Sequence, residues 1–461
     1  MPPAVRNRRQ PWELTEDDVT AALARIGERD EELAREAGHV YNSLTWDEGP
    51  GRIRRAGVQY WLWYQLPTKY ITGEAGYMGR LAETAAVLFD ELGLDAYAAV
   101  CKDERTAAVH AAFERSDTEG FKAMRKARDA SGIEPPDLDD FAWGQTMGME
   151  EARSHGTVEN TLEAAIDEGE LVVGGRGWRA RQQEIAAAAL DGDHPGEPGQ
   201  SWRTVVLTER IGDWVRTASM RNEQVGRRRA DIANQLLHPI DPPPDLAEHM
   251  RPVTWLLELF ADEQALTQAG YLNRAFVVQV HEQPPWEDPF RTRGAPRSET
   301  DVIVLHRLRA WMESAGALRK RGRVLRRTKR GDAMTRDPRL AWETLTRTVS
   351  PQGWDRFVIE DAAAILLERR QPVATRGLFD EIAADAVDLG WRTTDGGVQR
   401  PPSANDVRHA FHTSWALLEL FGFAAEHGDW RNRAVWTPPA GEPTLLAMLR
   451  ADAAGPKRRP W

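Results

Sequence analysis

Apolar residues recur at helical spacing through most of the first 150 residues, and this periodicity restricts that part of the chain to a helical fold. It is clearest in segments 83–92, 96–115 and 118–130, where every third or fourth residue is apolar. Gly93 and Gly132 stand where these helices should end, at positions where a left-handed cap favours glycine. We therefore expect an all-helical N-terminal region, beginning with a helix that Thr15 caps.

Prolines mark the predicted boundary between domains. Four of them fall between residues 239 and 244 and indicate a semi-rigid linker. We expect a helical domain over residues 1–240, a winged-helix-like domain with a basic hairpin over 246–350, and a second helical or winged-helix-like domain over 351–461. The predicted fold class is mainly α and multi-domain, with short β-hairpins in the C-terminal half, and an α/β sheet enzyme is disfavoured.

A short sequence repeat lies in the C-terminal half. The letters LLELF occur at residues 256–260 and again at 417–421, and each copy is followed by a threonine and then a glycine. A third threonine and glycine, Thr328 and Gly331, follow the hairpin described next. Leucine-rich helices also produce such five-letter matches by chance, so duplication and coincidence both stay open.

Segment 300–314 predicts a helix that is followed by a β-hairpin. Its apolar residues keep a helical period, and Gly322 supplies the permissive residue that a tight turn needs before Val324 and Leu325 restart a strand. A helix, a hairpin, a threonine and a glycine in this order are typical of a winged helix.

The predicted hairpin carries eight positive residues and no acid, although the whole chain has a net charge of -11. Such a patch can neutralise the phosphates of double-stranded DNA. On the preceding helix, Arg307, Arg309 and His306 are the candidates for contacts with base edges. The positive residues of the hairpin are Arg319, Lys320, Arg321, Arg323, Arg326, Arg327, Lys329 and Arg330.

Other uses of the hairpin fit the same residues. Runs of charge are often solvated faces, and an acidic neighbouring domain or the acidic surface of a partner protein could cover this one. The leading hypothesis is a non-enzymatic protein that binds DNA through residues 316–331, as a regulator or a chromosome- or plasmid-associated factor. The alternatives are a protein-interaction scaffold, and a hydrolase or nuclease whose site is dispersed along the sequence.

The single cysteine, Cys101, leaves no intrachain disulfide and no thiolate-rich metal site, and it favours a cytoplasmic location. It follows apolar residues on a predicted helix, so we interpret it as part of the core. No run of about 18 uncharged apolar residues occurs, and we expect neither a membrane span nor a signal peptide.

Motifs of familiar enzyme chemistry are absent from the sequence. It has no phosphate-binding loop, no dinucleotide-binding glycine pattern and no His-Glu-x-x-His, so we predict no catalytic residue, metal ligand or cofactor. Asp406, His409 and His412 share a predicted helix, but an N-cap at Asn405 or Asp406 beside ordinary histidines explains them more simply than a metal site. Acids in segment 299–303 would suit a nuclease only if the helical period of 300–314 were broken.

Three runs of sequence, residues 59–70, 131–137 and 174–182, resemble those of uncharacterised actinobacterial cytoplasmic proteins. Residues 266–272 together with 316–320 are also similar to the helical C-terminal region of some plasmid-encoded open-reading-frame proteins of actinobacteria. The second resemblance implies a winged-helix-like module. Neither resemblance implies an activity or a set of functional residues.

Overall fold

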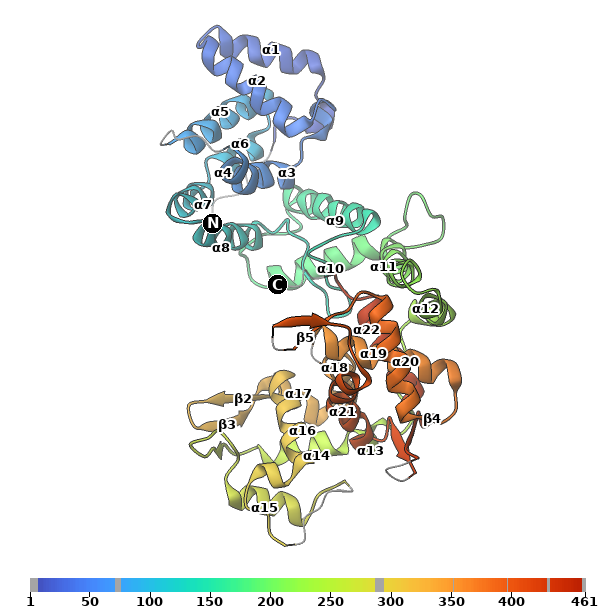
Figure 1. Ribbon diagram of the computed structural model, residues 1–461. Helices are drawn as coiled ribbons and strands as arrows, with labels where there is room; N and C mark the ends of the chain where they lie inside the picture. The colour runs from blue at the N-terminus through green and yellow to red at the C-terminus, as the bar shows by residue number, and fades with distance from the viewer. Residues whose placement is uncertain are drawn as a thin grey trace. The chain divides into compact units, whose positions relative to one another are not determined.

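The computed structural model describes residues 7–70, 76–286, 294–350, 352–395, 397–428 and 432–457. The chain is mainly helical, as predicted, with small antiparallel sheets in the C-terminal half. It divides into two compact units, residues 1–206 with 457–461 and residues 207–456 (Figure 1). Among the described residues, no helix is both long and apolar enough to cross a membrane.

The helices of the first unit pack around two hydrophobic clusters: one over residues 14–127, rich in aromatic side chains, and a smaller one over residues 141–206. Thr15 caps α1 and Gly93 and Gly132 adopt left-handed conformations after α5 and α8, which confirms those predictions. The helices are α1 (Glu16–Gly27), α2 (Glu31–Thr45), α3 (Arg55–Tyr60), a π-helical turn (Trp61–Gln65), α4 (Leu66–Lys69), α5 (Tyr77–Leu92), α6 (Asp95–Cys101), α7 (Glu104–Arg115), α8 (Asp117–Ser131), α9 (Met149–Glu168) and α10 (Trp178–Asp191), with 3-10 turns at Pro11–Glu13 and Pro50–Arg52. Helix α11 (Trp202–Ser219) begins in this unit.

The second unit contains two segments that follow the same order of elements, each with a helix, a short strand, two more helices, a hairpin and a final helix. The first repeat consists of α14 (Arg251–Leu259), β1 (Gln264–Ala265), α15 (Arg274–Glu282), α16 (Ile303–Ser314), β2 (Leu318–Arg321), β3 (Val324–Arg327) and α17 (Lys329–Arg336). The second repeat consists of α19 (Trp354–Arg369), β4 (Val373–Ala374), α20 (Thr375–Asp388), α21 (Ala404–Leu420), β7 (Ala425–His427), β8 (Ala434–Trp436) and α22 (Gly441–Ala453). Outside this common order lie α12 (Glu223–Leu236), α13 (Leu246–His249), a 3-10 turn (Glu299–Asp301), α18 (Pro338–Thr348) and an extra hairpin in the second repeat, β5 (Thr393–Asp395) with β6 (Val398–Arg400).

The two three-stranded sheets agree in strand order and in register. Each places the last strand of its repeat between the other two, in the orders β1-β3-β2 and β4-β8-β7. Leu325 pairs with Gln264 in the first sheet, and Val435 pairs with Val373 at the same place in the second. The agreement extends to the hairpins, where Lys320 opposite Leu325 corresponds to Glu426 opposite Val435. Residues of the two repeats can therefore be compared one by one.

A glycine locks the final helix of each repeat against the chain before its hairpin. A Cβ atom on Gly331 would lie 2.4 Å from the carbonyl oxygen of Ala317, and one on Gly441 would lie 2.0 Å from that of Phe423. Both distances are far below van der Waals contact, so only glycine fits at either position.

The LLELF letters are not the repeat that the structure contains. The first copy ends α14, the first helix of its repeat, whereas the second copy ends α21, the third helix of the other. The segment equivalent to 417–421 is 311–315 at the end of α16, because Gly316 and Gly422 both follow their helices with positive φ angles of +72° and +68°. The two LLELF copies therefore occupy different positions in the two repeats, so their match does not reflect the structural repeat.

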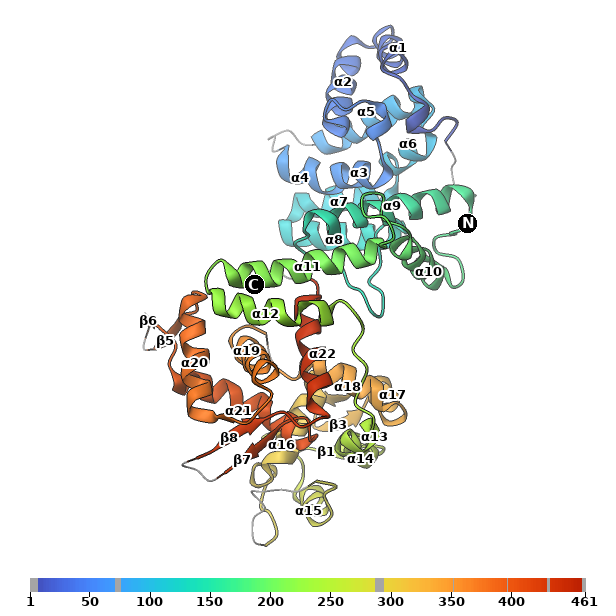
Figure 2. The same ribbon diagram turned by 90° about the vertical axis from the view of Figure 1, so that its right-hand side faces the viewer.

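One hydrophobic core runs through the whole second unit, from Ile211 to Ala454. The expected domains 246–350 and 351–461 therefore share a core instead of having one each. The unit also begins earlier than the expected boundary near residue 240, because α12 packs against α19 and α22. Helix α19 lies among α12, α20, α21 and α22 (Figure 2) and is buried on nearly every side.

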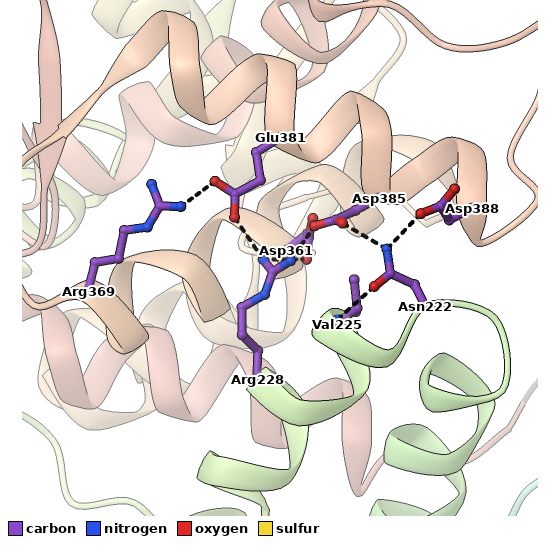
Figure 3. A network of polar contacts seen from close by, with 8 residues as sticks. All are labelled: Asn222, Val225, Arg228, Asp361, Arg369, Glu381, Asp385 and Asp388. Carbon is purple, nitrogen blue, oxygen red and sulfur yellow. Dashed lines mark hydrogen bonds and ion pairs between the residues drawn. The ribbon is translucent and has the colours of Figure 1, made fainter.

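A buried arginine joins α12 to the second repeat. Arg228 is only 2% exposed, and its Nη1 atom lies 3.4 Å from Asp361 Oδ1 and 3.8 Å from Glu381 Oε1. Its Nη2 atom bonds Asp385, which also accepts a hydrogen bond from Asn222 (2.9 Å; Figure 3). Burial raises the pKa of the Asp361 carboxyl, and the Arg228 guanidinium opposes that rise. The network fixes α12 on α19 and α20 by charge as well as by packing.

We expect Arg228→Met to destabilise the second unit by about 3–5 kcal/mol, because it leaves Asp361 and Asp385 buried without their cation. Adding Asp361→Asn and Asp385→Asn should restore part of that loss, and Arg227→Met, on the exposed neighbour, should change stability by less than about 0.5 kcal/mol. Urea denaturation followed by circular dichroism measures all of these. Equal losses for Arg228→Met and Arg227→Met would contradict a structural role for the network.

Gly331→Ala should destabilise the second unit by about 1–3 kcal/mol, because its Cβ atom meets a backbone oxygen that cannot move alone. Gly441→Ala should cost a similar amount if the two repeats are built alike. Gly377→Ala provides the control, since its Cβ atom would enter open space within α20 and alanine favours a helix. If thermal unfolding showed that Gly377→Ala loses as much stability as Gly331→Ala and Gly441→Ala, the result would contradict this role of the two glycines.

Candidate nucleic-acid interface

The basic hairpin, residues 318–330, is fixed by main-chain contacts where it leaves α16 and enters α17. The backbone N–H of Thr328 donates to the carbonyl oxygen of Ala317 (3.0 Å), and its hydroxyl donates to that of Gly316 (2.7 Å). The same hydroxyl accepts the N–H of Gly331 and so caps α17. The two strands therefore leave the core at a defined place, at the left-hand edge of the second unit in Figure 1.

One face of the hairpin packs against the core through its leucines, although it also carries Lys320 and Arg327, and the opposite face carries Arg319, Arg321 and Arg326. Gly322 occupies the first position of its two-residue turn with φ +63°, which confirms the predicted hairpin. Leu318 and Leu325 are buried against the core, whereas Arg319 and Arg321 stand on the opposite face and are exposed. The strands thus present their cations to solvent while their leucines hold them in place.

Three of the eight cations have protein partners that limit their use. Arg327 is engaged most fully, since its Nε lies 2.6 Å from Asp332 Oδ1 and its Nη1 donates to the carbonyl oxygen of Leu257 (3.0 Å). Arg330 donates to Thr344 (3.1 Å), and Arg326 lies 3.8 Å from Glu263 with both side chains largely exposed. In the part of the chain that the structure describes, no carboxylate lies within 4 Å of Arg319, Lys320, Arg321, Arg323 or Lys329.

The arrangement of these cations opposes local stability. Arg319 lies directly opposite Arg326 across the strands, and like charges in that position are destabilising. Lys329 and Arg330 occupy the first turn of α17, at the positive end of its dipole, where acids are preferred. An anion bound between the two facing arginines would offset the first penalty, and an anion bound at the start of α17 would offset the second.

Of the candidates for base contacts on α16, Arg309 is buried and fully engaged. Its Nε donates to Glu299 (2.7 Å) and its Nη1 to Glu313 (2.8 Å). Glu299 itself is 0% exposed and also bonds His306 Nδ1 (2.9 Å) and the N–H of Leu272 (2.7 Å). Arg309 therefore anchors α16 to the protein, and we leave it and Arg327 out of the proposed interface.

Arg307 lies among charges of the second repeat. It interacts electrostatically with Glu419 and His412, and Glu426 lies in the same cluster with Arg433 (3.0 Å). The solvent-facing stripe of α16 otherwise consists of Ile303, Ala310 and Ser314, which offer little hydrogen bonding to a base edge. In α16, the polar side chains that could read a sequence are thus mostly engaged within the protein.

The second repeat shows that the same hairpin and sheet can form without most of these cations. By strand register, Arg319, Lys320 and Arg321 correspond to Ala425, Glu426 and His427. Likewise, Arg326 corresponds to Trp436. Lys329 and Arg330, the two residues before Gly331, correspond to Pro439 and Ala440, the two residues before Gly441. Arg323 corresponds to Arg433, which is paired with Glu426 (3.0 Å). The same fold therefore carries unpaired cations on the hairpin of its first copy, and an arginine paired with a glutamate in the described part of its second hairpin.

The other candidate residues have structural roles. Ser403, not Asn405 or Asp406, is the N-cap of α21; Asp406 completes its capping box and binds Arg400. His409 bonds the carbonyl oxygen of Asn405 (2.7 Å). No group of three or more His, Cys, Asp or Glu side chains suited to a metal ion occurs within the described ranges.

Cys101 is buried, as interpreted from the sequence, and burial raises its thiol pKa to about 12. Of the two acids considered for a nuclease, Glu299 anchors α16, and Asp301 caps the preceding turn through the N–H groups of Arg297 and Ser298. These acids are therefore accounted for by the fold.

Two signals in the sequence could have separated the engaged arginines from the free ones. Glu313 stands four residues after Arg309, the spacing of an intrahelical ion pair, and Asp332 follows closely after Arg327. Glu299, by contrast, reaches its partners only through tertiary structure. Local spacing alone does not indicate that a glutamate ten residues earlier is buried beside Arg309.

Comparisons with protein-family models, with curated proteins and with solved structures find no match to this chain. The resemblance to actinobacterial and plasmid-encoded proteins stays an expectation, and a function must be argued from the chain's own residues.

Glu419→Gln should make the protein less sensitive to alkaline pH. Burial, together with the neighbouring Glu426, raises the pKa of Glu419 to about 7, so the native state holds a proton that the unfolded state releases near pH 4.5. Stability from this group is thus complete at low pH and lost as the pH rises to about 7. At pH 8 the variant should exceed the wild type by roughly 1 kcal/mol after allowance for solvent screening.

At pH 5 the two proteins should unfold at similar temperatures in a thermal scan. Glu368→Gln, on an exposed glutamate of the same unit, is the matched control and should show no such pH dependence. A Glu419→Gln protein that is no more stable than wild type at pH 8 would overturn the assignment.

Proposed function

We propose that this protein is a non-enzymatic, cytoplasmic DNA-binding protein whose basic hairpin contacts the phosphates of a duplex. In this proposal the two repeats are winged-helix-like modules, and the hairpin of the first acts as the wing. Support comes from the order of helices, the three-stranded sheets and the exposed cations of the hairpin.

The observation that carries the proposal is the difference between two hairpins with the same register. The fold itself requires some residues that the two repeats share, such as Gly331 and Gly441, where a Cβ atom would meet a backbone oxygen. It does not explain Arg319, Lys320 and Arg321, whose counterparts are neutral or acidic. Arg319 also carries a like-charge penalty, because it lies opposite Arg326. Binding of a polyanion gives these cations a use, because each phosphate that they neutralise releases counterions.

The proposed contact is with the backbone and is independent of base sequence. Arg309 is engaged by glutamates, Arg307 lies near the acids of the second repeat, and the free stripe of α16 is largely apolar. Phosphate contacts position a protein on DNA but carry no sequence information. We therefore favour an architectural or chromosome- or plasmid-associated role over that of a site-specific regulator.

The triple substitution Arg319→Gln, Arg321→Gln and Arg323→Gln should weaken duplex binding about tenfold or more and reduce the salt slope by about 3, one for each lost phosphate contact. The measurement is fluorescence anisotropy of a labelled mixed-sequence duplex at several salt concentrations. These three side chains have no carboxylate partner among the described residues, so the variant should fold normally.

A charge-matched control replaces three exposed arginines elsewhere in the same unit, Arg251, Arg347 and Arg376, by glutamine. It should retain wild-type binding, and duplexes of unrelated sequence should bind within about threefold of one another, since phosphates are common to all. No binding by the wild type at low salt would reject the proposal. It would leave the hairpin as a surface for an acidic protein, the second hypothesis.

A further inference from the structure

The first unit contains a cavity of about 280 Å³ that is lined by α3, α8, the segment after α8, and α9. Its volume is close to the lower end of the range for ligand sites, about 300–1,000 Å³, and suits a small molecule. Gly57 and Ile133 contribute apolar surface, and Gln59 and Tyr60 contribute polar side chains. The cavity lies wholly within the first unit and is separate from the basic hairpin.

Gln59 points to a ligand because its amide lies at the cavity without a partner. The residue is only 7% exposed, and its side chain makes no hydrogen bond with any residue that the structure describes. Both amide atoms nevertheless keep contact with solvent, so a molecule in the cavity can reach them. A buried amide without a partner costs about 1–3 kcal/mol and is rare in native proteins. A ligand with a donor and an acceptor side by side would satisfy the Gln59 nitrogen and oxygen together.

The charged part of the lining includes a fixed ion pair. Arg128 donates its Nε–H and an Nη2–H to the two carboxylate oxygens of Glu134 (both 2.8 Å), and its Nη1 has no partner among the described residues. Glu159 is held less tightly, because its Oε1 lies 3.5 Å from His155 Nδ1, beyond the usual length of a hydrogen bond. The cavity therefore offers a guanidinium donor and a carboxylate acceptor besides the Gln59 amide.

Tyr60 adds an aromatic ring to the same lining. It is 48% exposed, and its ring stacks on that of Tyr64 with 5.0 Å between centroids and 21° between planes. Tyr64 is outside the lining, so the cavity meets a part of the Tyr60 ring that this stacking does not cover. An exposed ring that is held in place suits contact with a planar ligand.

We propose that this cavity binds a purine base, either free or as part of a nucleoside. The heterocycle would lie against the ring of Tyr60, since aromatic side chains stack on bases. Its edge would pair with the Gln59 amide, as glutamine pairs with the N6 and N7 atoms of adenine. Arg128 Nη1 would donate to a ring nitrogen or a carbonyl oxygen, and the Glu159 carboxylate would accept from an amino group of the base.

Other ligand classes satisfy fewer of these groups. A simple ammonium ion would meet Glu159 but would leave the Gln59 nitrogen and Arg128 Nη1 without acceptors. A carboxylate or phosphate would meet Arg128 but would face Glu134 and Glu159 with like charge. A hydrocarbon would cover the polar groups without pairing any of them. A neutral planar heterocycle with donors and acceptors on its edges fits the whole lining.

Saturation-transfer difference NMR on the full chain tests this proposal, with adenosine, guanosine, cytidine and uridine as separate probes. Ribose and benzoate are the control compounds, since the first has no base and the second is an aromatic anion without donor groups. We expect signals from at least one purine nucleoside and none from either control compound. No signal from adenosine or guanosine, or signals of equal strength from benzoate, would overturn the proposal.

Two substitutions locate the binding. Gln59→Leu should weaken nucleoside binding about tenfold, because the hydrogen bonds to the amide are lost. It should not lower the thermal stability of the protein, since leucine has a similar size and leaves no buried amide without a partner. Gly57→Leu should abolish binding, because its Cβ atom enters open space at the cavity and the side chain would occupy it.

Gly79→Leu is the matched control for the second substitution. Gly79 is also an exposed helical glycine whose Cβ atom would meet open space, but it is outside the lining, so this variant should bind like wild type. Wild-type binding by Gln59→Leu or by Gly57→Leu would overturn the proposal. Nucleosides carry no phosphate and these residues lie in the first unit, so none of these outcomes bears on DNA binding by the hairpin.

Discussion

A guanidinium buried among carboxylates is the interaction on which the second unit depends most. Arg228 cannot leave its site without stranding Asp361 and Asp385 in a region that water does not reach. The contact holds α12 against α19 and α20, and it makes residues before the proline-rich linker part of the same folded body. It therefore helps to hold the second repeat, and through the shared core the first repeat and its hairpin, in one arrangement.

The sequence predicted features that arise from local geometry. Helical periodicity, the Thr15 cap, the left-handed Gly93 and the turn at Gly322 all depend on residues a few positions apart. The extent of the second unit and the engagement of Arg309 by Glu299 depend on partners that only tertiary structure brings together. The repeat shows the same limit, because backbone register defines it and the side chains have diverged.

A comparison of the two repeats distinguishes residues that the fold requires from residues that determine the chemistry of the surface. Both keep a glycine against a carbonyl oxygen and a leucine or valine at the centre of a three-stranded sheet. They differ in charge: the first hairpin carries cations without carboxylate partners, whereas in the described part of the second hairpin Arg433 is paired with Glu426. The polar residues of α16 are mostly engaged inside the protein. A duplex would therefore contact this surface through its phosphates and not through hydrogen bonds that depend on the base sequence.

The position of β2 in its sheet has a consequence for self-association. It is an outer strand, so one row of its backbone N–H and C=O groups has no neighbouring strand within the sheet order β1-β3-β2. Exposed edges of this kind invite pairing with the same edge of another molecule, and natural proteins often prevent it with charged side chains. Arg319 and Arg321 would bring four positive charges together in such a pair. The cations that we assign to phosphate binding therefore also keep the molecules apart when no polyanion is present.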